Sequence, residues 1–369
     1  MRLSIIIFLF SLLIGQQPDK ILEGIKSRAK SLDVTDRKYG DHNGNRILNR
    51  FYNFGGIGDG GNLVSGVYPF GSGHSYFYEF TPVVTASVID TNGNRVHIVS
   101  DGAVALKDNS PEGYQWGFEP LTGYANPNQE IMAMSDKSFT WPETWPNRDS
   151  DWDGYWNGQY GKYVRADQES YFVMDDYYND EFAHFPDSAD TDTVLPKRRS
   201  GLGVELEARV YQWNHPAAED IIIVTYWITN VGTSRLDSVV FGMYGDADIG
   251  STNGDYTDDD AWFDIDNDIV YQWDHDGWSN ADGGFKPVYF GWCFLESPGN
   301  PHDGIDNDTD GMIDESQFDG IDNDEDWLAE RDDIGSDGLG EYHYGYNGPD
   351  EDGTEGNGIP DLGEPNFEI

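Results

Sequence analysis

The sequence predicts a mainly β fold, an antiparallel β-sandwich, either one large or two smaller, with long loops and an irregular Asp-rich C-terminal segment. Runs of strand length that are rich in Val, Ile, Tyr, Phe and Trp recur from residue 167 to residue 296. Gly, Asp, Asn or Pro separate these runs. No stretch between residues 50 and 300 carries a long helical period, so packed sheets are the economical way to bury the apolar faces.

Residues 1–15 have the pattern of a secretory signal peptide. Met1 and Arg2 give a positive start, and a mostly apolar run of twelve residues follows from Leu3 to Ile14. That run is too short to cross bilayer hydrocarbon of about 30 Å, which takes roughly 20 residues in a helix. The alternative is a hydrophobic N-terminal strand. We expect a secreted protein, extracellular or at the cell surface, with no membrane span in the mature chain.

Residues 16–48 are predicted to be a lead-in to the β-rich part of the chain. Between Asp19 and Asp33, the residues Ile21, Leu22 and Ile25 fall at helical spacing, and a polar stretch follows. We interpret this region as a short helix or a mobile segment.

The β-rich core is predicted over residues 49–300, with a possible subdivision near residue 165. Two β-prone runs flank Asn92-Gly93, which is the strongest short-range signal for a hairpin. From Val204 to Val210, apolar residues alternate with charged ones, which predicts a strand with one buried and one wet face. The run Ile221–Ile228 is apolar on both faces, as expected for a central strand.

A Trp-rich stretch interrupts the strand pattern before residue 165. Its composition is typical of a loop, and two interpretations of its tryptophans stay open: burial under the loop, or a platform on which the C–H faces of sugar rings stack. The residues concerned are Trp141, Trp145, Trp152 and Trp156.

Charge and cysteine content limit the partners of the chain. The net charge of −46 and the pI near 4.1 exclude nucleic acid as a natural ligand, because phosphate is repelled by such a surface. Cations are the natural partners. The single cysteine, Cys293, cannot form an intramolecular disulfide, and its apolar surroundings in the sequence predict a buried free thiol.

The Asp-rich segment, residues 301–369, is expected to bind calcium. Hard cations such as Ca²⁺ take six to eight oxygen ligands, which a loop supplies from alternate positions if a Gly permits a sharp turn. A calcium loop carries a Glu at its last position, where this sequence has Gln317. We expect Glu315 or a carboxylate from the next repeat to take the place of that Glu. The predicted ligands are Asp306, Asp308, Asp310, the carbonyl of Met312, Asp314 and Glu315.

Two further matches to this spacing are weaker. The second copy in the C-terminal segment has Trp327 in place of Gly and offers Asp322, Asp324, Asp326 and Glu330. The other match lies in the Trp-rich loop and offers Asp149, Asp151, Asp153, the carbonyl of Tyr155, and Asn157. For all three segments the alternative is a solvated acidic loop. We favour structural Ca²⁺, because unpaired carboxylates at this density repel one another until a divalent ion neutralises them.

No motif of a known catalytic site is present. The sequence lacks a G-x-S-x-G elbow, an H-E-x-x-H pair, a phosphate-binding loop and a dinucleotide fingerprint. Paired carboxylates are so numerous that glycosidase chemistry can be neither argued nor excluded. The sequence therefore favours a protein that is not an enzyme.

Three stretches carry a resemblance to a family: "ADQESYFVMDDYYNDEF", "EDIIIVTYWITNVGTSRLDSVVFGMYGDADIG" and "DGIDNDTDGMIDE". From Asn49 to Phe367 the chain resembles uncharacterised large secreted or surface proteins of the Bacteroidetes and Ignavibacteria type with Asp-rich calcium-binding-like repeats. The resemblance implies location and architecture and no activity. Members are generally longer and end in a sorting domain, so we expect this sequence to be a truncated gene or a fragment.

Together these observations predict a secreted, non-catalytic calcium-binding β-sandwich protein that serves as a cell-surface, adhesion or extracellular-matrix component. Its partners would be calcium ions, with glycans or other surface proteins. The alternative is a carbohydrate-active protein, a glycan-binding module or a glycoside hydrolase, that uses the Trp-rich loop.

Overall fold

The fold is taken from a computed structural model of the chain. It describes the backbone of residues 5–13 and the residues 36–60, 64–103, 116–187, 198–250, 258–265, 267–281 and 284–296, with isolated positions between 329 and 358. The chain divides into two compact units, Met1–Ser11 with Gln17–Leu295, and Leu12–Gln16 with Glu296–Ile369. The candidate site and both sheets, except the last residues of β1 and β13, belong to the first unit.

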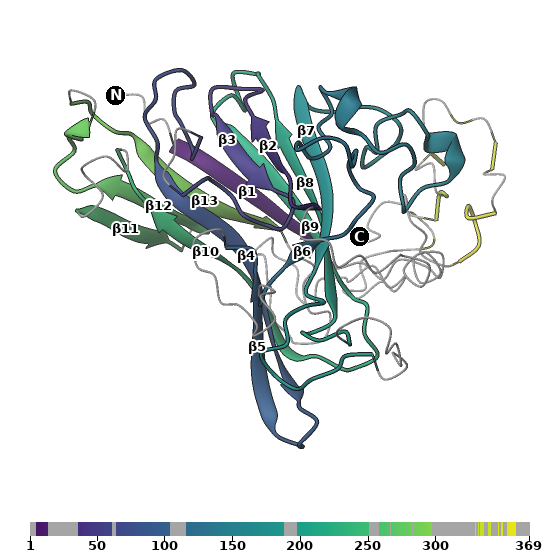
Figure 1. The fold of residues 1–369 in the computed structure, drawn as a ribbon. Helices are drawn as coiled ribbons and strands as arrows, with labels where there is room; N and C mark the ends of the chain where they lie inside the picture. Colours follow the sequence, from purple (N-terminus) through teal and green to yellow (C-terminus); the bar gives the residue numbers. More distant parts are fainter. Residues whose placement is uncertain are drawn as a thin grey trace. The chain divides into compact units, whose positions relative to one another are not determined.

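The larger sheet has eight strands in the order β11-β12-β13-β1-β9-β8-β7-β6, and all of its described registers are antiparallel. The long strands β7, β8 and β9 lie side by side, and the loops that precede β7 lie beside them (Figure 1). The strand bounds are β1 Ile5–Leu13, β6 Glu119–Pro120, β7 Gln168–Asp175, β8 Val204–Gln212, β9 Ile221–Asn230, β11 Asp259–Asp264, β12 Ile269–Asp274 and β13 Tyr289–Glu296.

Strand β1 comes from the segment that the sequence predicts to be a signal peptide. It takes the place between β13 and β9, which corresponds to the alternative of a hydrophobic N-terminal strand. Cleavage during export would remove this strand from the sheet, so secretion stays a prediction. In the part of the chain that the structure describes, no helix is long and apolar enough to span a bilayer.

A three-stranded sheet, in the order β10-β4-β5, forms the other layer, and a separate hairpin joins β2 to β3. The predicted hairpin at Asn92-Gly93 is present as the β4–β5 turn, where Gly93 has a φ of 83°. Only glycine adopts such a conformation readily. The strand bounds are β2 Tyr39–His42, β3 Asn49–Tyr52, β4 Phe77–Ile89, β5 Arg95–Asp101 and β10 Asp237–Ala247.

Aromatic side chains join the two layers. The ring of Phe80 on β4 lies 5.3 Å from the ring of Phe290 and 4.1 Å from that of Trp292, both on β13. Tyr226 on β9 and Phe241 on β10 make a second contact at 5.5 Å. Full burial of each such side chain stabilises the fold by roughly 1.5–3 kcal/mol. The prediction of a mainly β, antiparallel sandwich is confirmed.

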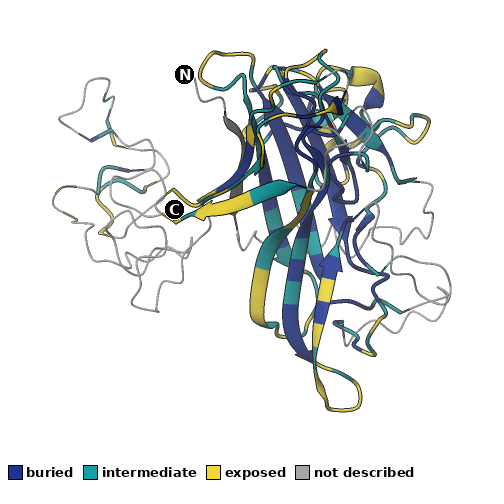
Figure 2. Ribbon diagram, turned by 90° about the vertical axis from the view of Figure 1, so that its left-hand side faces the viewer, coloured by how far each residue is buried: buried dark blue, intermediate teal, exposed yellow. Residues whose placement is uncertain are grey.

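Burial follows the predicted pattern along β8 except at Arg209, whereas apolar residues of β10 and β11 such as Val240 and Trp262 are exposed. The apolar residues of β8 are buried as predicted, and the long strands are dark blue over much of their length (Figure 2). Arg209, which was expected on the wet face of β8, is only 1% exposed. Its guanidinium donates to the carbonyl of Asn157 and lies over the ring of Tyr171, because the loop before β7 covers this face.

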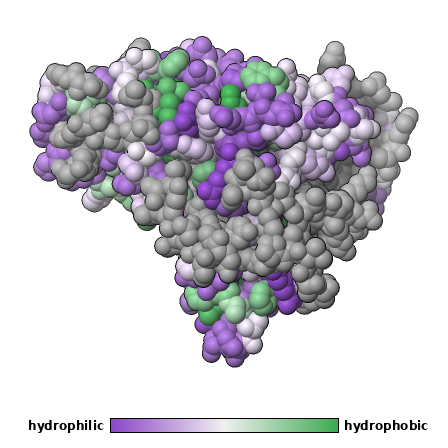
Figure 3. Space-filling model, in the orientation of Figure 1, coloured by the Kyte–Doolittle hydropathy of each residue, from purple (hydrophilic) through white to green (hydrophobic). Residues whose placement is uncertain are grey.

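Cys293 is buried and has no disulfide partner, as predicted, and burial raises the pKa of its thiol. On the face that Figure 3 shows, hydrophilic residues dominate much of the described surface, and hydrophobic residues form separate patches. One hydrophobic patch lies on the projecting end that β4 and β5 form (Figures 1 and 3).

Candidate functional site

Three carboxylates meet where β11 begins and β12 ends. Asp258 precedes β11, Asp274 is the last residue of β12, and Asp276 lies in the turn that follows. One oxygen from each of these residues lies within 4.8 Å of the other two. This is the one such group of three acidic, His or Cys ligands found among the described residues.

The antiparallel register of β11 and β12 brings these residues together. Asp259 is the register partner of Asp274, so the residue before β11 reaches the turn after β12. The backbone N–H of His275 donates to the carbonyl of Asp258 at 3.1 Å. The N–H of Trp278 donates to one carboxylate oxygen of Asp274 and one of Asp276, both at 2.8 Å. These bonds fix the turn with its carboxylates side by side.

Several of the acidic oxygens at this site lack a donor. Asp274 is only 3% exposed, and its second carboxylate oxygen is buried without a hydrogen bond. One buried oxygen each of Asp258 and Asp259 is also without a donor. A buried oxygen that is left unpaired destabilises a fold by about 1–3 kcal/mol, more when it is charged. Among the described residues, no donor satisfies these strong acceptors.

Burial and mutual repulsion raise the pKa values of the acids around this group. Burial is the largest cause of the rise for Asp259, whose pKa reaches about 7, and the negative charges of Asp248, Asp274 and Asp258 add to it. Burial, helped by Asp246, raises the pKa of Asp248 to about 6. Without a counter-charge, burial and repulsion therefore shift these groups toward the protonated form.

The donor set matches a hard cation. Ca²⁺ binds oxygens at 2.3–2.6 Å, so two oxygens on one ion lie at most about 5 Å apart, which is compatible with the 4.8 Å separation. His275 lies in the turn after β12, and its Nδ1 is 2.6 Å from the carboxylate of Asp260. Asp260 raises the pKa of that imidazole. Asp258, Asp274 and Asp276 could supply three of the six to eight oxygens that Ca²⁺ takes.

The predicted calcium ligands of the C-terminal segment lie outside the described residues. These are Asp306, Asp308, Asp310, Met312, Asp314, Glu315, Asp322, Asp324, Asp326 and Glu330.

In the Trp-rich loop, the structure does not gather the predicted ligands around one point. Asp149, Asp151 and Asp153 are exposed and form no group of three. The carboxylate of Asp151 instead pairs with the ammonium of Lys162 at 2.6 Å. The buried side-chain oxygen of Asn157 accepts from Arg148, and the carbonyl of Tyr155 accepts from Trp145. These contacts use oxygens that the spacing assigned to a cation.

The tryptophans of this loop divide into two kinds. Trp145 and Trp156 are each 2% exposed and belong to a core cluster with Tyr124, Ala133, Tyr171 and Val173. The indole N–H of Trp156 donates to the carboxylate of Glu169 at 2.7 Å. The stacking platform is therefore wrong for Trp145 and Trp156, which follow the burial alternative. Trp141 and Trp152 are half-buried.

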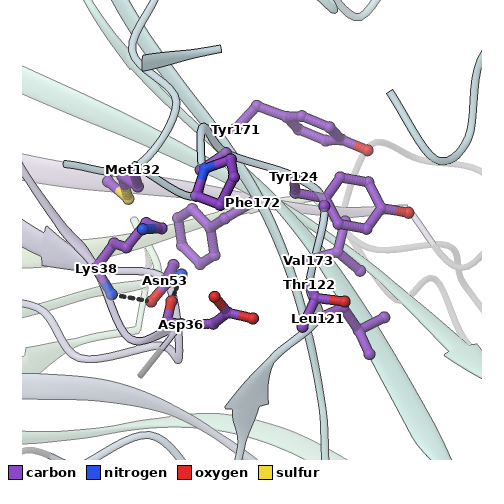
Figure 4. A pocket seen from close by; sticks show the side chains of 13 residues that line it. Asp36, Lys38, Asn53, Leu121, Thr122, Tyr124, Met132, Tyr171, Phe172 and Val173 are labelled. Carbon is purple, nitrogen blue, oxygen red and sulfur yellow. Dashed lines mark hydrogen bonds between the residues drawn. The ribbon is translucent and has the colours of Figure 1, made fainter. Parts of the chain in front are cut away.

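A cavity of about 170 Å³ lies beside this cluster (Figure 4). Tyr124, Tyr171, Phe172 and Val173 line part of it. Lys38, also on its wall, donates its backbone N–H to the side chain of Asn53 at 2.7 Å and its ammonium to the carbonyl of Gln129. Among the described residues of this wall we find no pairing of a nucleophile with a base, and burial holds the pKa of Tyr171 well above its usual range. The cavity therefore carries no part of the argument for a function.

Comparison of the chain with family models, with curated proteins and with solved structures finds no match. The site therefore has to be interpreted from its own geometry. The sequence did not reveal it, because Asp258 and Asp274 belong to different segments and share no loop spacing. The register of β11 against β12 is the feature that would predict this site. The sequence does not reveal that register, because the Asp-rich composition of β11 is unlike that of a strand.

Proposed function

We propose that this chain is a secreted, non-catalytic calcium-binding β-sandwich protein that serves as a cell-surface, adhesion or matrix component. The observation that carries the proposal is the set of buried carboxylate oxygens at Asp258, Asp259 and Asp274, to which no donor of the described residues is bonded. A divalent ion beside them would supply the missing positive charge. The net charge of −46 supports a cation as partner.

The proposed role of the ion is structural. It would join the start of β11, the end of β12 and the following turn, which are held at this point by backbone hydrogen bonds such as that from His275 to Asp258. Extracellular calcium modules bind with dissociation constants of about 10⁻⁴ to 10⁻³ M. The site would then fill outside the cell and stay empty in the cytosol.

Calorimetric titration of the EDTA-stripped chain with Ca²⁺ tests the proposal. We expect binding heat and a melting temperature that rises with Ca²⁺, because a ligand that binds only the folded state stabilises it. In Asp258→Asn with Asp274→Asn, the share of the heat that belongs to this site should disappear. The metal-free variant should be no less stable than the wild type, since two repelling charges are gone.

Two matched variants separate this site from the other acidic segments. Asp149→Asn with Asp151→Asn changes the exposed loop and should leave the binding heat unchanged. Asp308→Ala with Asp310→Ala tests the predicted C-terminal repeat in the same way. Equal heats in the wild type and the Asp258 and Asp274 variant would remove the proposed site.

In the carbohydrate-active alternative, only Trp141 and Trp152 of the four tryptophans remain candidates for stacking on a sugar, because Trp145 and Trp156 are buried. No specific observation favours it over calcium binding.

A further inference from the structure

Strand β11 forms one edge of the eight-stranded sheet. It stands at the end of the strand order and pairs with β12, and no other described strand pairs with it. An edge strand presents a row of backbone N–H and C=O groups that can pair with a further strand. Natural proteins usually protect such edges with charges, proline or a bulge.

The middle of β11 is apolar and open on both faces. Trp262 and Phe263 are adjacent, so their side chains point to opposite faces of the sheet. Trp262 is 62% exposed and Phe263 is 50% exposed, and Ile265 in the following turn is 76% exposed. A partner that lay on one face of the sheet would leave one of the two rings in water. A strand added along the edge can contact both.

Acidic residues dominate the sequence around this edge, and His275, beside Asp260, is the one histidine among them. Between Arg235 and Lys286 the sequence holds 13 Asp and no Glu, Lys or Arg. Asp259, Asp260 and Asp264 lie on β11 itself. The partner that complements this edge is basic, and the exposed indole of Trp262 adds a favourable site for an ammonium or guanidinium group.

The same charges disfavour a second copy of this chain. Antiparallel pairing of β11 with itself about its centre would place Asp259 of one copy opposite Asp264 of the other, twice. Like charges directly opposite in neighbouring strands are destabilising. The observations therefore favour another protein over self-association.

We propose that the free edge of β11 binds an extended Lys- or Arg-rich segment of a partner protein as an added β-strand. Backbone hydrogen bonds to β11 would supply most of the affinity, as in other strand-addition complexes. Apolar side chains of the partner would cover Trp262 and Phe263, and its basic side chains would lie near Asp260 and Asp264. This inference does not rest on the proposed calcium site.

A capped synthetic peptide of alternating Val and Lys is a suitable probe, with binding followed by fluorescence anisotropy on the whole chain. Two control peptides accompany it. One carries Glu in place of Lys, and the other carries N-methyl groups on alternate backbone nitrogens, which prevents strand pairing. We expect binding of the Val-Lys peptide, weakened by added salt, and no binding of either control.

Variants of exposed residues locate the contact. Trp262→Ser with Phe263→Ser should weaken binding of the Val-Lys peptide by roughly tenfold or more. Ile265→Lys adds a like charge at a position that is 76% exposed and should weaken it as well. Phe139→Ser, which removes a ring that is 55% exposed elsewhere on the chain, should leave it unchanged.

Equal binding of the N-methylated peptide, or binding that the Trp262 and Phe263 changes do not affect, would reduce the contact to general charge attraction and overturn the proposal. Dimers of the chain alone that the double variant abolishes would assign the edge to a second copy instead. Glycan-array binding that depends on Trp262 would assign the surface to sugars. Each of these two results would also overturn the proposal.

Discussion

The guanidinium of Arg209 lies over the ring of Tyr171, with its central carbon 4.0 Å from the ring centroid, and both side chains are buried. The same guanidinium donates to the carbonyl of Asn157 and lies 3.5 Å from the carboxylate of Glu207. This arginine therefore connects strand β8 to β7 and to the loop that covers them.

Arg209→Met should destabilise the chain strongly. The change leaves the buried carbonyl of Asn157 without its charged donor, which costs about 1–3 kcal/mol, and removes the guanidinium from the ring of Tyr171. The free energy of unfolding from urea titration measures the effect. Arg95→Met removes an exposed ion pair with Asp237 and should change that free energy by less than about 1 kcal/mol. Similar losses in the two variants would contradict the role given to Arg209.

Gly66→Ala should destabilise the fold by about 2–4 kcal/mol, since an added methyl overpacks the core and the backbone conformation disfavours a side chain. Gly66 has a φ of 59°, and a Cβ there would lie 2.2 Å from a ring carbon of Phe77. Gly93 is the matched control, with a φ of 83° and no atom within 4 Å of its Cβ position. Gly93→Ala should cost only about 1 kcal/mol. Thermal melts that rank the two variants the other way would contradict this packing.

His42 should make the chain less stable in acid. Burial, with Lys137 nearby, lowers the pKa of its imidazole from 6.5 to about 3, and its Nδ1 has no hydrogen-bond partner. Below pH 6.5 the imidazole of His42 takes up a proton in the unfolded chain, whereas in the folded chain it stays neutral until the pH approaches 3. The contribution of His42 is present above pH 6.5 and is lost as the pH falls toward 3, by at most about 5 kcal/mol.

The difference between the wild type and His42→Gln isolates this group from the carboxylates that titrate in the same range. Unfolding free energies measured from pH 7 to pH 4 should converge as the pH falls. Parallel curves for the two proteins would show that His42 does not titrate in this way.

Trp156→Phe should destabilise the chain by about 2–4 kcal/mol. The change removes the donor to the buried carboxylate of Glu169 and leaves a gap in the core cluster. Trp152→Phe is the control, because its half-buried ring lies under Arg148 and Lys162 near the surface, and we expect less than about 1 kcal/mol. Chemical denaturation of both variants distinguishes the buried from the peripheral tryptophan.

The fold was predictable from the sequence where the signal was local. The β4–β5 hairpin follows from Asn92-Gly93, and β8 and β9 follow from their apolar patterns. Strand β11 was not predictable, because three of its six residues are Asp, a residue depleted in strands. The burial of Arg209 was not predictable either. It depends on which loop covers the face of β8, and no local sequence pattern gives that information.

The candidate site could not be predicted from the sequence for a related reason. A calcium loop is a spacing within one segment, whereas Asp258 and Asp274 meet only through the pairing of two strands. The spacing in the Trp-rich loop was a local match, but in the folded chain Lys162 and Arg148 contact two of its side chains. Cationic side chains of the protein itself, which a spacing does not take into account, thus contact two of the predicted ligands.

Strand β4, Phe77–Ile89, has as its two neighbours β5, which follows directly, and β10, Asp237–Ala247. During synthesis on the ribosome, one edge of this early apolar strand stays unpaired until residue 247 has emerged. Pairings between such distant segments form slowly, and an open edge invites aggregation in the meantime. The order of the strands along the chain therefore makes the interval between the synthesis of β4 and that of β10 the period of greatest aggregation risk.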